Sequence, residues 1–530
     1  MPVEERFDWV VIGSGFGGSV AALRLAEKGY RVCVLEKGRR FAAEDFPRSN
    51  WDLRRWLWLP HFGLRGIFQM SFMRHVTVFH GVGVGGGSLG YANALPQPHP
   101  AFYRAPSWAH LGDWRSELEP HYATARRMLG ATTVPYATPG DEILREIAGE
   151  LGREEDFGSP DVAVYFGQPG ERAPDPFFGG EGPEVVGCTH CGACMTGCRV
   201  GAKNTLDRNY LHLAERRGCR IEADTEARAV RPRAGGGYLI EARHRQRTPR
   251  AFAADRVVFA GGVMGTLPLL LAMKEDPAGL PRLSDRLGHG IRTNSEALLG
   301  VIAPDAADFS HGVTITSILQ LGEDGHVEPA RFGKGSGFFR LVTLPHAPGA
   351  TAWARIGGAF AGYLRHPRKW WRALTARDFA RASQILLYMR ATDGSMRVRL
   401  GRGLRTGFLR GLVTELDDPA HAPRAFMEEA TDLARRWAEK VRGVTAAMFT
   451  ETLLGVPSTA HVLGGCGMGV DAAEGVIDRD HRLFGYDGLY VIDGAAVSAN
   501  PGVNPALTIA ALAERAMAKV PAKETDAAAD

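Results

Sequence analysis

Four of the 7 cysteines form one short run in the middle of the chain: Cys188, Cys191, Cys194 and Cys198. Their C-x2-C-x2-C-x3-C spacing is that of a ferredoxin sequence, in which thiolates hold the corners of a 4Fe-4S cluster. Arg199 replaces the proline that usually follows, and the chain has no second run of this kind. Zinc, a redox disulfide and unliganded structural thiols are the alternatives. The spacing favours one 4Fe-4S cluster, with Cys198, Cys219 or Cys466 as its fourth ligand.

A glycine-rich turn follows the first apolar segment of the chain. Residues 8–12 are predicted to form a buried strand, residues 19–28 a helix, and residues 31–35 a second strand that ends at Glu36. Gly13 permits the tight turn, Gly15 lets the backbone approach a pyrophosphate, and Gly18 allows close packing of the helix on the strand. Glu36 can accept hydrogen bonds from ribose hydroxyls. This βαβ pattern predicts a binding site for NAD or FAD.

A second glycine-rich loop follows a predicted strand at residues 76–79. It contains the candidate cofactor-binding residues Gly81, Gly85, Gly86 and Ser88. Without side chains, its backbone can pass directly over a flat ring or a diphosphate.

Two later segments repeat the pattern of a strand followed by glycine. Residues 256–259 lead into a turn at Gly261, and residues 489–492 end at Asp493 and Gly494, ahead of a helix predicted over residues 506–519. These elements extend from Gly13 to Asn504, whereas a simple NAD-dependent dehydrogenase keeps its nucleotide elements in one contiguous domain. The pattern therefore favours FAD, bound by residues from both ends of the chain.

Length and composition exclude several classes of protein. At 530 residues the chain is too long for one compact core, so two joined domains are expected. The formal net charge of +4 is too small to suggest nucleic-acid binding. No apolar run approaches the roughly 20 residues that cross a bilayer, and the first residues lack the pattern of an export signal. A cytoplasmic location is expected, with a disordered tail at 521–530.

Positive charge is concentrated between residues 365 and 410. Basic residues there are opposed only by Asp378 and Asp393; they are Arg365, Arg368, Lys369, Arg372, Arg377, Arg381, Arg390, Arg397, Arg399, Arg402, Arg405 and Arg410. Aromatic residues are interleaved with them, and with the arginines of a second stretch at 51–74. Such a mixture suits peripheral contact with a membrane. The alternative is a solvated basic helix face whose aromatic side chains point into the core.

The order of these motifs resembles that of the glucose-methanol-choline (GMC) oxidoreductases. The resemblance covers about residues 7–519 and includes the segments 13–18, 81–88, 258–266, 458–466, 493–494 and 502–505. Within the family the chain is most similar to the bacterial cholesterol oxidases and their actinobacterial relatives. The resemblance implies an FAD enzyme that oxidises an alcohol to a carbonyl by hydride transfer to flavin.

The resemblance also implies roles for single residues. His461 corresponds to the active-site histidine of the family, which can hold a substrate hydroxyl or accept its proton. Asn504 corresponds to the residue paired with it across the flavin, next to Pro505, and its amide can orient the hydroxyl. The backbone near Val230 is expected to contact the adenine end of FAD. Glu296 and Glu328 are candidates for the glutamate that moves a proton during double-bond isomerisation in sterol oxidases.

The expected fold is α/β, an FAD-binding Rossmann-like domain with a substrate-binding domain built on a largely antiparallel sheet with helices. We expect FAD-binding parts at 1–110, 186–299 (with the cysteine-rich insert 188–198) and 451–520, a helical covering segment at 111–185 and the substrate-binding domain at 300–450. The aromatic and aliphatic residues of 300–450 suit a wide apolar cavity.

The expected substrate is a 3β-hydroxysteroid such as cholesterol or a similar bulky lipid alcohol, with oxygen or an electron carrier as acceptor. One alternative is a long-chain alcohol dehydrogenase that passes electrons through an iron-sulfur centre to a carrier. A nicotinamide-dependent dehydrogenase and a flavoprotein electron carrier or lipid-binding module without turnover are the others.

Overall fold

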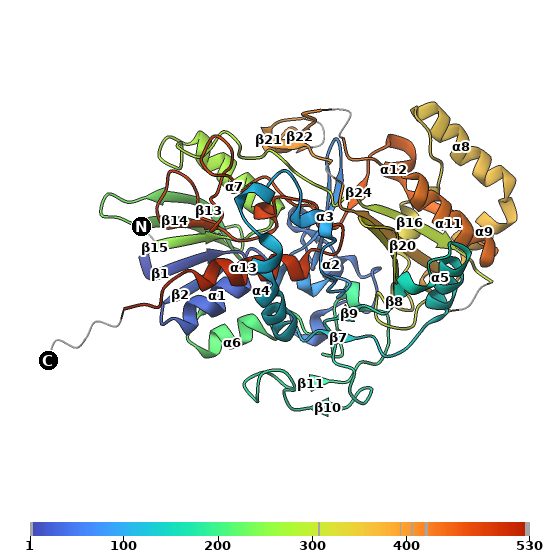
Figure 1. Cartoon of the computed structure of the whole chain (residues 1–530), viewed down its shortest axis with the longest axis horizontal. Helices are drawn as coiled ribbons and strands as arrows, with labels where there is room; N and C mark the ends of the chain where they lie inside the picture. The colour runs from blue at the N-terminus through green and yellow to red at the C-terminus, as the bar shows by residue number, and fades with distance from the viewer. Residues whose placement is uncertain (1–3, 306–307, 393, 404–405, 419–421, 525–530) are drawn as a thin grey trace.

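The computed structural model describes residues 4–305, 308–392, 394–403, 406–418 and 422–524. Two seven-stranded sheets organise these residues and lie side by side along the long axis of the molecule (Figure 1). The first has the order β12-β2-β1-β15-β14-β13, and β25 also pairs with β15. Its strands are β1 (Glu4–Ile12), β2 (Val32–Leu35), β12 (Arg220–Glu222), β13 (Thr225–Pro232), β14 (Tyr238–His244), β15 (Thr248–Phe259) and β25 (Leu489–Val491).

The parallel part of the first sheet joins distant parts of the chain. β1 pairs in parallel with β2 and β15, while β25 pairs in parallel with β15. Between β1 and α1 (Phe16–Glu27) the chain turns at Gly13, which has a φ of +105°. A Cβ on Gly13 would lie 2.3 Å from the carbonyl oxygen of Ala260, and one on Gly18 would lie 2.1 Å from that of Gly13. Glycine is therefore required where α1 packs against the sheet.

The second sheet is antiparallel and has the order β19-β23-β16-β20-β18-β17-β8. Its strands are β8 (Phe157–Gly158), β16 (Ala297–Ile302), β17 (Ile318–Gln320), β18 (Gly325–Ala330), β19 (Thr343–Pro345), β20 (Ser383–Arg390) and β23 (Val444–Met448). α5 (Pro139–Glu150) and α11 (Glu428–Lys440) pack against one face, where Leu299 joins Leu144 and Trp437 in a buried cluster. The α/β fold with a second, antiparallel sheet confirms the expected fold class.

The remaining helices and several smaller sheets surround the two large sheets (Figure 1). The other helices are α2 (Leu53–Trp56), α3 (Pro100–Tyr103), α4 (Trp114–Met128), α6 (Tyr210–Arg216), α7 (Val263–Glu275), α8 (Ala352–Arg365), α9 (Pro367–Thr375), α10 (Phe379–Ala382), α12 (Phe449–Leu454) and α13 (Ala506–Ala518). Smaller sheets are formed by β3 (Trp58–Leu59), β4 (Leu64–Arg65), β5 (Phe68–Phe72), β6 (Thr77–Gly81), β7 (Thr132–Thr133), β9 (Asp161–Val162), β10 (Arg172–Ala173), β11 (Val185–Val186), β21 (Arg397–Gly401), β22 (Gly411–Glu415) and β24 (Ser458–Thr459).

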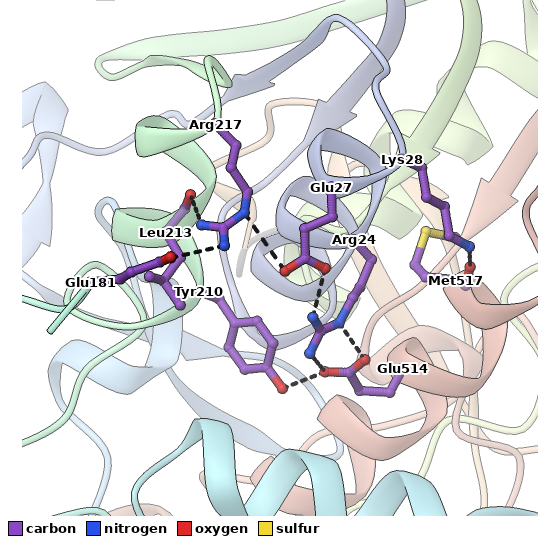
Figure 2. Close-up of polar contacts among 9 residues, drawn as sticks. All are labelled: Arg24, Glu27, Lys28, Glu181, Tyr210, Leu213, Arg217, Glu514 and Met517. Carbon is purple, nitrogen blue, oxygen red and sulfur yellow. Dashed lines mark hydrogen bonds and ion pairs between the residues drawn. The ribbon is translucent and has the colours of Figure 1, made fainter. Parts of the chain in front are cut away.

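A cluster of polar side chains joins α1, α6 and α13 (Figure 2). Arg24 of α1 donates from Nε and Nη2 to the two carboxylate oxygens of Glu514 in α13, at 2.7 and 2.8 Å. The hydroxyl of Tyr210 in α6 donates to the same carboxylate at 2.7 Å. Because the Glu514 side chain is only 5% exposed, the cluster replaces the water that its charge loses on burial. It links the first nucleotide-binding helix to the last helix of the chain.

Two sequence expectations concern the membrane and the end of the chain. Among the described residues, no helix is long and apolar enough to cross a membrane. Residues 525–530, which belong to the tail expected to be disordered, lie outside the described residues.

Candidate active site

A cavity of about 610 Å³ lies between the two sheets and is lined by residues of both. Of the residues singled out from the sequence, the lining includes Gly13, Gly15, Glu36, Gly81, Gly86, Gly261, Glu296, His461, Asp493, Gly494, Asn504 and Pro505. These residues come from both ends and the middle of the chain. The fold thus brings both predicted catalytic residues and most of the predicted cofactor-binding residues to one cavity.

The imidazole of His461 lies beside a buried carboxylate. Its Nδ1 is 3.1 Å from Oε2 of Glu296, whose side chain is inaccessible to solvent. The same oxygen accepts hydrogen bonds from the Thr459 hydroxyl (2.8 Å) and the Ala460 N–H (3.1 Å). Since Nδ1 faces Glu296, Nε2 is the ring nitrogen left for a ligand in the cavity.

Charge from this neighbour governs the titration of His461. Burial acts to lower the pKa of His461, but the Glu296 carboxylate, together with that of Glu328, outweighs burial and the pKa is raised. The imidazolium is thus stabilised relative to the neutral ring. A proton received by His461 would be held by the pair.

A strained backbone segment positions the pair and connects it to Asn504. Asn294 and Ser295 have φ values of +58° and +41°, in the left-handed region that non-glycine residues rarely adopt. The Asn294 side chain donates to the carbonyl oxygen of Val503 (2.8 Å) and accepts from the Gly502 N–H (2.9 Å). One short segment therefore places Glu296 against His461 and holds the loop that carries Asn504.

The second sheet supplies an apolar wall to the cavity. In β16 the residues alternate: Leu299 packs against the helices, whereas Leu298 and Ile302 line the cavity. Phe339 and Phe379 extend this wall beyond the strands. A ligand that reaches His461 from this side contacts mainly hydrocarbon.

The glutamates named from the sequence occupy different surroundings. Glu296 lines the cavity next to His461. Glu328 lies in β18, away from the cavity lining, with Oε1 3.1 Å from Nε2 of the fully buried His326. Of the two, Glu296 is the one that lines the cavity beside His461.

Comparison with known proteins identifies the family. Models described as GMC oxidoreductase match residues 183–273 and 393–513, and an NAD(P)-binding Rossmann-like model matches residues 11–50. Cholesterol oxidase of Mycobacterium tuberculosis (strain H37Rv) is 44% identical over 98% of this chain and 92% of its own length. The chain belongs to the GMC oxidoreductase family. It is therefore an FAD-dependent oxidoreductase that acts on CH–OH groups.

Other similar proteins have names that specify cholesterol or a different alcohol. Cholesterol oxidase of Acinetobacter baumannii is 40% identical over 98% of this chain and 95% of its own length. 2-Methyl-1,2-propanediol dehydrogenase of Mycolicibacterium austroafricanum is 24% identical, covering 97% and 94% of the two chains. Pyridoxine 4-oxidase from Mesorbium loti has a similar fold, with a TM-score of 0.61, 15% identity and coverage of 97% and 98%.

The cavity of this GMC chain has the features that FAD requires. A Cβ on Gly15 would meet nothing within 4 Å, so open space lies over the turn that is expected to receive the pyrophosphate. Buried polar atoms also line the cavity without a hydrogen-bond partner among the described residues: both amide atoms of Asn93, Nε2 of His80 and Oδ1 of Asn504. Because unpaired buried polar groups are costly, these atoms fit a polar ligand such as FAD.

Asn93 was not predicted from the sequence as a site residue. It is fully buried, has a φ of +72° and lines the cavity with both amide atoms unpartnered. Its position just after the Gly81–Ser88 loop was the only available signal, because asparagine is one of the few residues that tolerate a positive φ.

The carboxylates of Glu36 and Asp493 accept hydrogen bonds from backbone N–H groups, and both residues line the cavity. The carboxylate of Glu36 accepts from the Ser14 hydroxyl (2.7 Å) and the Gly38 N–H (2.8 Å). That of Asp493 accepts from the Thr266 hydroxyl (2.6 Å) and the Gly262 N–H (2.8 Å), and burial raises its pKa to about 6. The contact of Glu36 with ribose remains a prediction.

Four other residues proposed to bind the cofactor lie outside the cavity lining: Gly18, Gly85, Ser88 and Val230. Gly18 packs against Gly13. The Ser88 hydroxyl donates a hydrogen bond to the carbonyl oxygen of Gly85 at 2.7 Å and so stabilises the loop. Val230 is fully buried, and its N–H points to Sδ of Met273 at 3.3 Å. β13 has a register shift between Ala227 and Ala229, and residues 225–228, before or at the shift, line the cavity instead.

The cysteine run lines a second, smaller cavity of about 20 Å³. Cys188, Cys191, Cys194 and Cys198 all contribute to it, and all are free thiols; neither Cys219 nor Cys466 lines it. No group of three or more His, Cys, Asp or Glu side chains within the described ranges is placed to hold a metal ion. The structure thus brings the four predicted ligands to one cavity without closing them around a single point.

Proposed function

We propose that this GMC oxidoreductase oxidises the hydroxyl group of a sterol, such as a 3β-hydroxysteroid, or of a similarly bulky lipid alcohol. The observation that carries the proposal is the position of the His461–Glu296 pair at the end of an apolar wall formed by the second sheet. The names of the relatives at 44% and 40% identity support a sterol as substrate.

The polar residues have separate tasks in this reaction. Nε2 of His461 accepts the hydroxyl proton, and the Glu296 carboxylate stabilises the imidazolium that results. Asn504 orients the hydroxyl through its amide, since it cannot act as a base. FAD bound in the cavity supplies the acceptor for the hydride that leaves the alcohol carbon. The apolar wall excludes water and holds the hydrocarbon body of the substrate.

Substitution of the two polar residues tests this assignment. We expect His461→Gln and Asn504→Ala to retain bound FAD but to slow alcohol-dependent flavin reduction, by about 10²–10⁴-fold for His461→Gln, which loses the base. Stopped-flow absorbance under anaerobic conditions measures this step, and the visible spectrum of the resting protein reports bound flavin. Full activity in either variant would remove that residue from the site.

The structure supports a membrane surface as the source of the substrate. α8 carries Trp353, Ile356, Phe360 and Leu364 on its solvent side, and Trp353 is 82% exposed. The spacing places these residues along one face of the helix. Its buried polar residue, Arg355, is turned inward and donates to the carbonyl oxygen of Gly349 at 2.9 Å. Apolar side chains of α8 therefore face solvent while Arg355 faces inward, which is the reverse of the usual orientation of an amphipathic helix.

Basic residues continue this face. Arg365, Arg368 and Lys369 are exposed at the junction of α8 and α9 and have no carboxylate partner in the part of the chain that the structure describes. Apolar side chains beside unpaired positive charge suit an anionic bilayer surface. α8 packs on β19, whose Thr343 lines the cavity, so the helix lies close to the apolar wall. Arg405 and Asp393 of the same basic stretch lie outside the described residues.

A further inference from the structure

We infer that the cavity lined by Cys188, Cys191, Cys194 and Cys198 holds a 4Fe-4S cluster, which receives electrons from the flavin site and passes them to a one-electron carrier. The inference deepens the proposed alcohol oxidation, on which it rests, because it specifies how the electrons leave.

The spacing of the four cysteines and the cavity that they share suit a 4Fe-4S cluster. In a 4Fe-4S cube each thiolate binds its own iron atom, so the four sulfur atoms surround a space. The four cysteines line one such space together, and no other cysteine reaches it.

The surroundings of this cavity are mainly apolar on its inner side. Val164, Val200 and Ala202 line it there, and Thr189, Lys203 and Gly312 also belong to the lining. The three apolar side chains pack with Val134 and Val313 in a buried cluster that also includes Cys188. A folded apolar shell of this kind excludes water from a bound cluster.

The cysteine loop is in direct contact with the wall of the large cavity. Cys194 lines the small cavity, whereas the next residue, Met195, lines the large one. The buried ammonium group of Lys203 donates to the carbonyl oxygens of Cys194 (2.9 Å), Leu89 (3.1 Å) and Tyr91 (3.1 Å). It therefore ties the cysteine loop to the segment that follows the Gly81–Ser88 loop. The linings of the two cavities thus meet at the adjacent residues Cys194 and Met195.

The other side of the small cavity reaches the surface. Cys191 is exposed, while Cys188 is buried. A cluster here would lie between the flavin cavity and solvent, where an external carrier can approach. Formation of the carbonyl removes two electrons and two protons from the alcohol. The electrons leave singly and reduce two molecules of a one-electron carrier, and the protons pass to solvent.

Anaerobic purification followed by iron and acid-labile sulfide assays tests the site. We expect about four iron and four sulfide per chain and a broad absorption near 400 nm in addition to the flavin bands. The double variant Cys191→Ser/Cys198→Ser should lose iron, sulfide and the broad band but retain FAD. Cys219→Ser, a buried cysteine that lines neither cavity, is the matched control and should retain all of them.

Three outcomes would overturn the inference. They are bound zinc without sulfide, absence of iron and sulfide after anaerobic reconstitution, and full iron content in the double variant. Electron paramagnetic resonance after anaerobic addition of cholesterol tests the electron path, because a reduced cluster should appear as the flavin bleaches. A cluster that stays oxidised beside bleached flavin would contradict the path. Bleaching itself tests the proposed function, so the two ideas fail separately.

Discussion

The chemistry of His461 depends on a residue far away in sequence. Glu296 supplies the carboxylate that lies 3.1 Å from Nδ1 and raises the pKa of the ring against the effect of burial. The left-handed backbone of Asn294 and Ser295 places that carboxylate beside His461. Strain of this kind persists only where surrounding contacts impose it, and here those contacts are to the Thr459–His461 and Gly502–Asn504 segments.

Removal of the Glu296 charge should shift the pH dependence of flavin reduction to lower pH. The neutral imidazole is the form that accepts a proton, so the rate rises as pH passes the pKa of His461. In Glu296→Gln, burial is no longer opposed by this carboxylate, and the pKa of His461 falls. Anaerobic stopped-flow measurements across pH would record the shift.

Glu328→Gln is the matched control for this prediction. Its carboxylate also raises the pKa of His461, but less than that of Glu296, so a smaller shift in the same direction is expected. An unshifted profile in Glu296→Gln, or a shift to higher pH, would show that this carboxylate does not govern the charge of His461.

Residue roles could be predicted from the sequence where local geometry demanded one residue type. Gly13, Gly15 and Gly18 have the expected surroundings, since a side chain would clash at the first and third and would enter open space at the second. Asn93 and the pairing of Glu296 with His461 could not be predicted, because they arise from contacts between segments distant in sequence. Val230 lies beyond a register shift in β13, and such a shift could not be predicted from the sequence either.

At the scale of elements, the contact between α1 and α13 joins the first nucleotide-binding helix to the last helix of the chain. Glu514→Ala would remove one of the two carboxylate partners of Arg24, which keeps Glu27, and would free the Tyr210 hydroxyl (Figure 2). We expect the free energy of unfolding to fall by about 1.5–3 kcal/mol, the usual contribution of hydrogen bonds to a charged group, because Glu27 still neutralises Arg24. Chemical denaturation of the holoenzyme, followed by circular dichroism, measures the change.

Tyr210→Phe is the matched control for the ion pair. It removes one hydrogen bond to Glu514 and leaves the ion pair, so the expected loss is about 0.5–1.5 kcal/mol. Equal losses in both variants would show that the ion pair contributes no more than the tyrosine contact.

The elements nearest the cofactor were the most predictable. The strand and helix predicted at residues 8–12 and 19–28 correspond to Glu4–Ile12 and Phe16–Glu27, and the late helix predicted over 506–519 corresponds to Ala506–Ala518. Their boundaries follow from glycine turns and continuous apolar runs. For the second sheet we could predict that it is antiparallel but not which strands pair. Pairs such as β16 with β23 join residues far apart in the chain and depend on tertiary packing.

At the scale of the whole molecule, the exposed apolar face of α8 should bind lipid. We expect the protein to co-sediment with anionic vesicles, and binding to weaken as salt screens the basic residues beside α8. Trp353→Ser/Phe360→Ser should reduce binding without changing the activity on a detergent-solubilised alcohol.

Val470→Ser tests whether this effect is specific to α8. Val470 is an exposed apolar residue elsewhere in the chain, and its replacement should leave vesicle binding unchanged. Binding that is equally strong in the double variant and the wild type would exclude α8 as the lipid-binding face.

The two sheets together make the central claim of alcohol oxidation testable in one experiment. One sheet forms the FAD site, the other forms the apolar wall, and His461 lies where they meet. The decisive measurement is the anaerobic absorption spectrum of the purified holoenzyme before and after addition of cholesterol, and then of a long-chain primary alcohol. We predict flavin bands that bleach with cholesterol. Flavin that stays oxidised with both alcohols would contradict the proposed substrate class, and a protein purified without flavin would contradict the cofactor assignment itself.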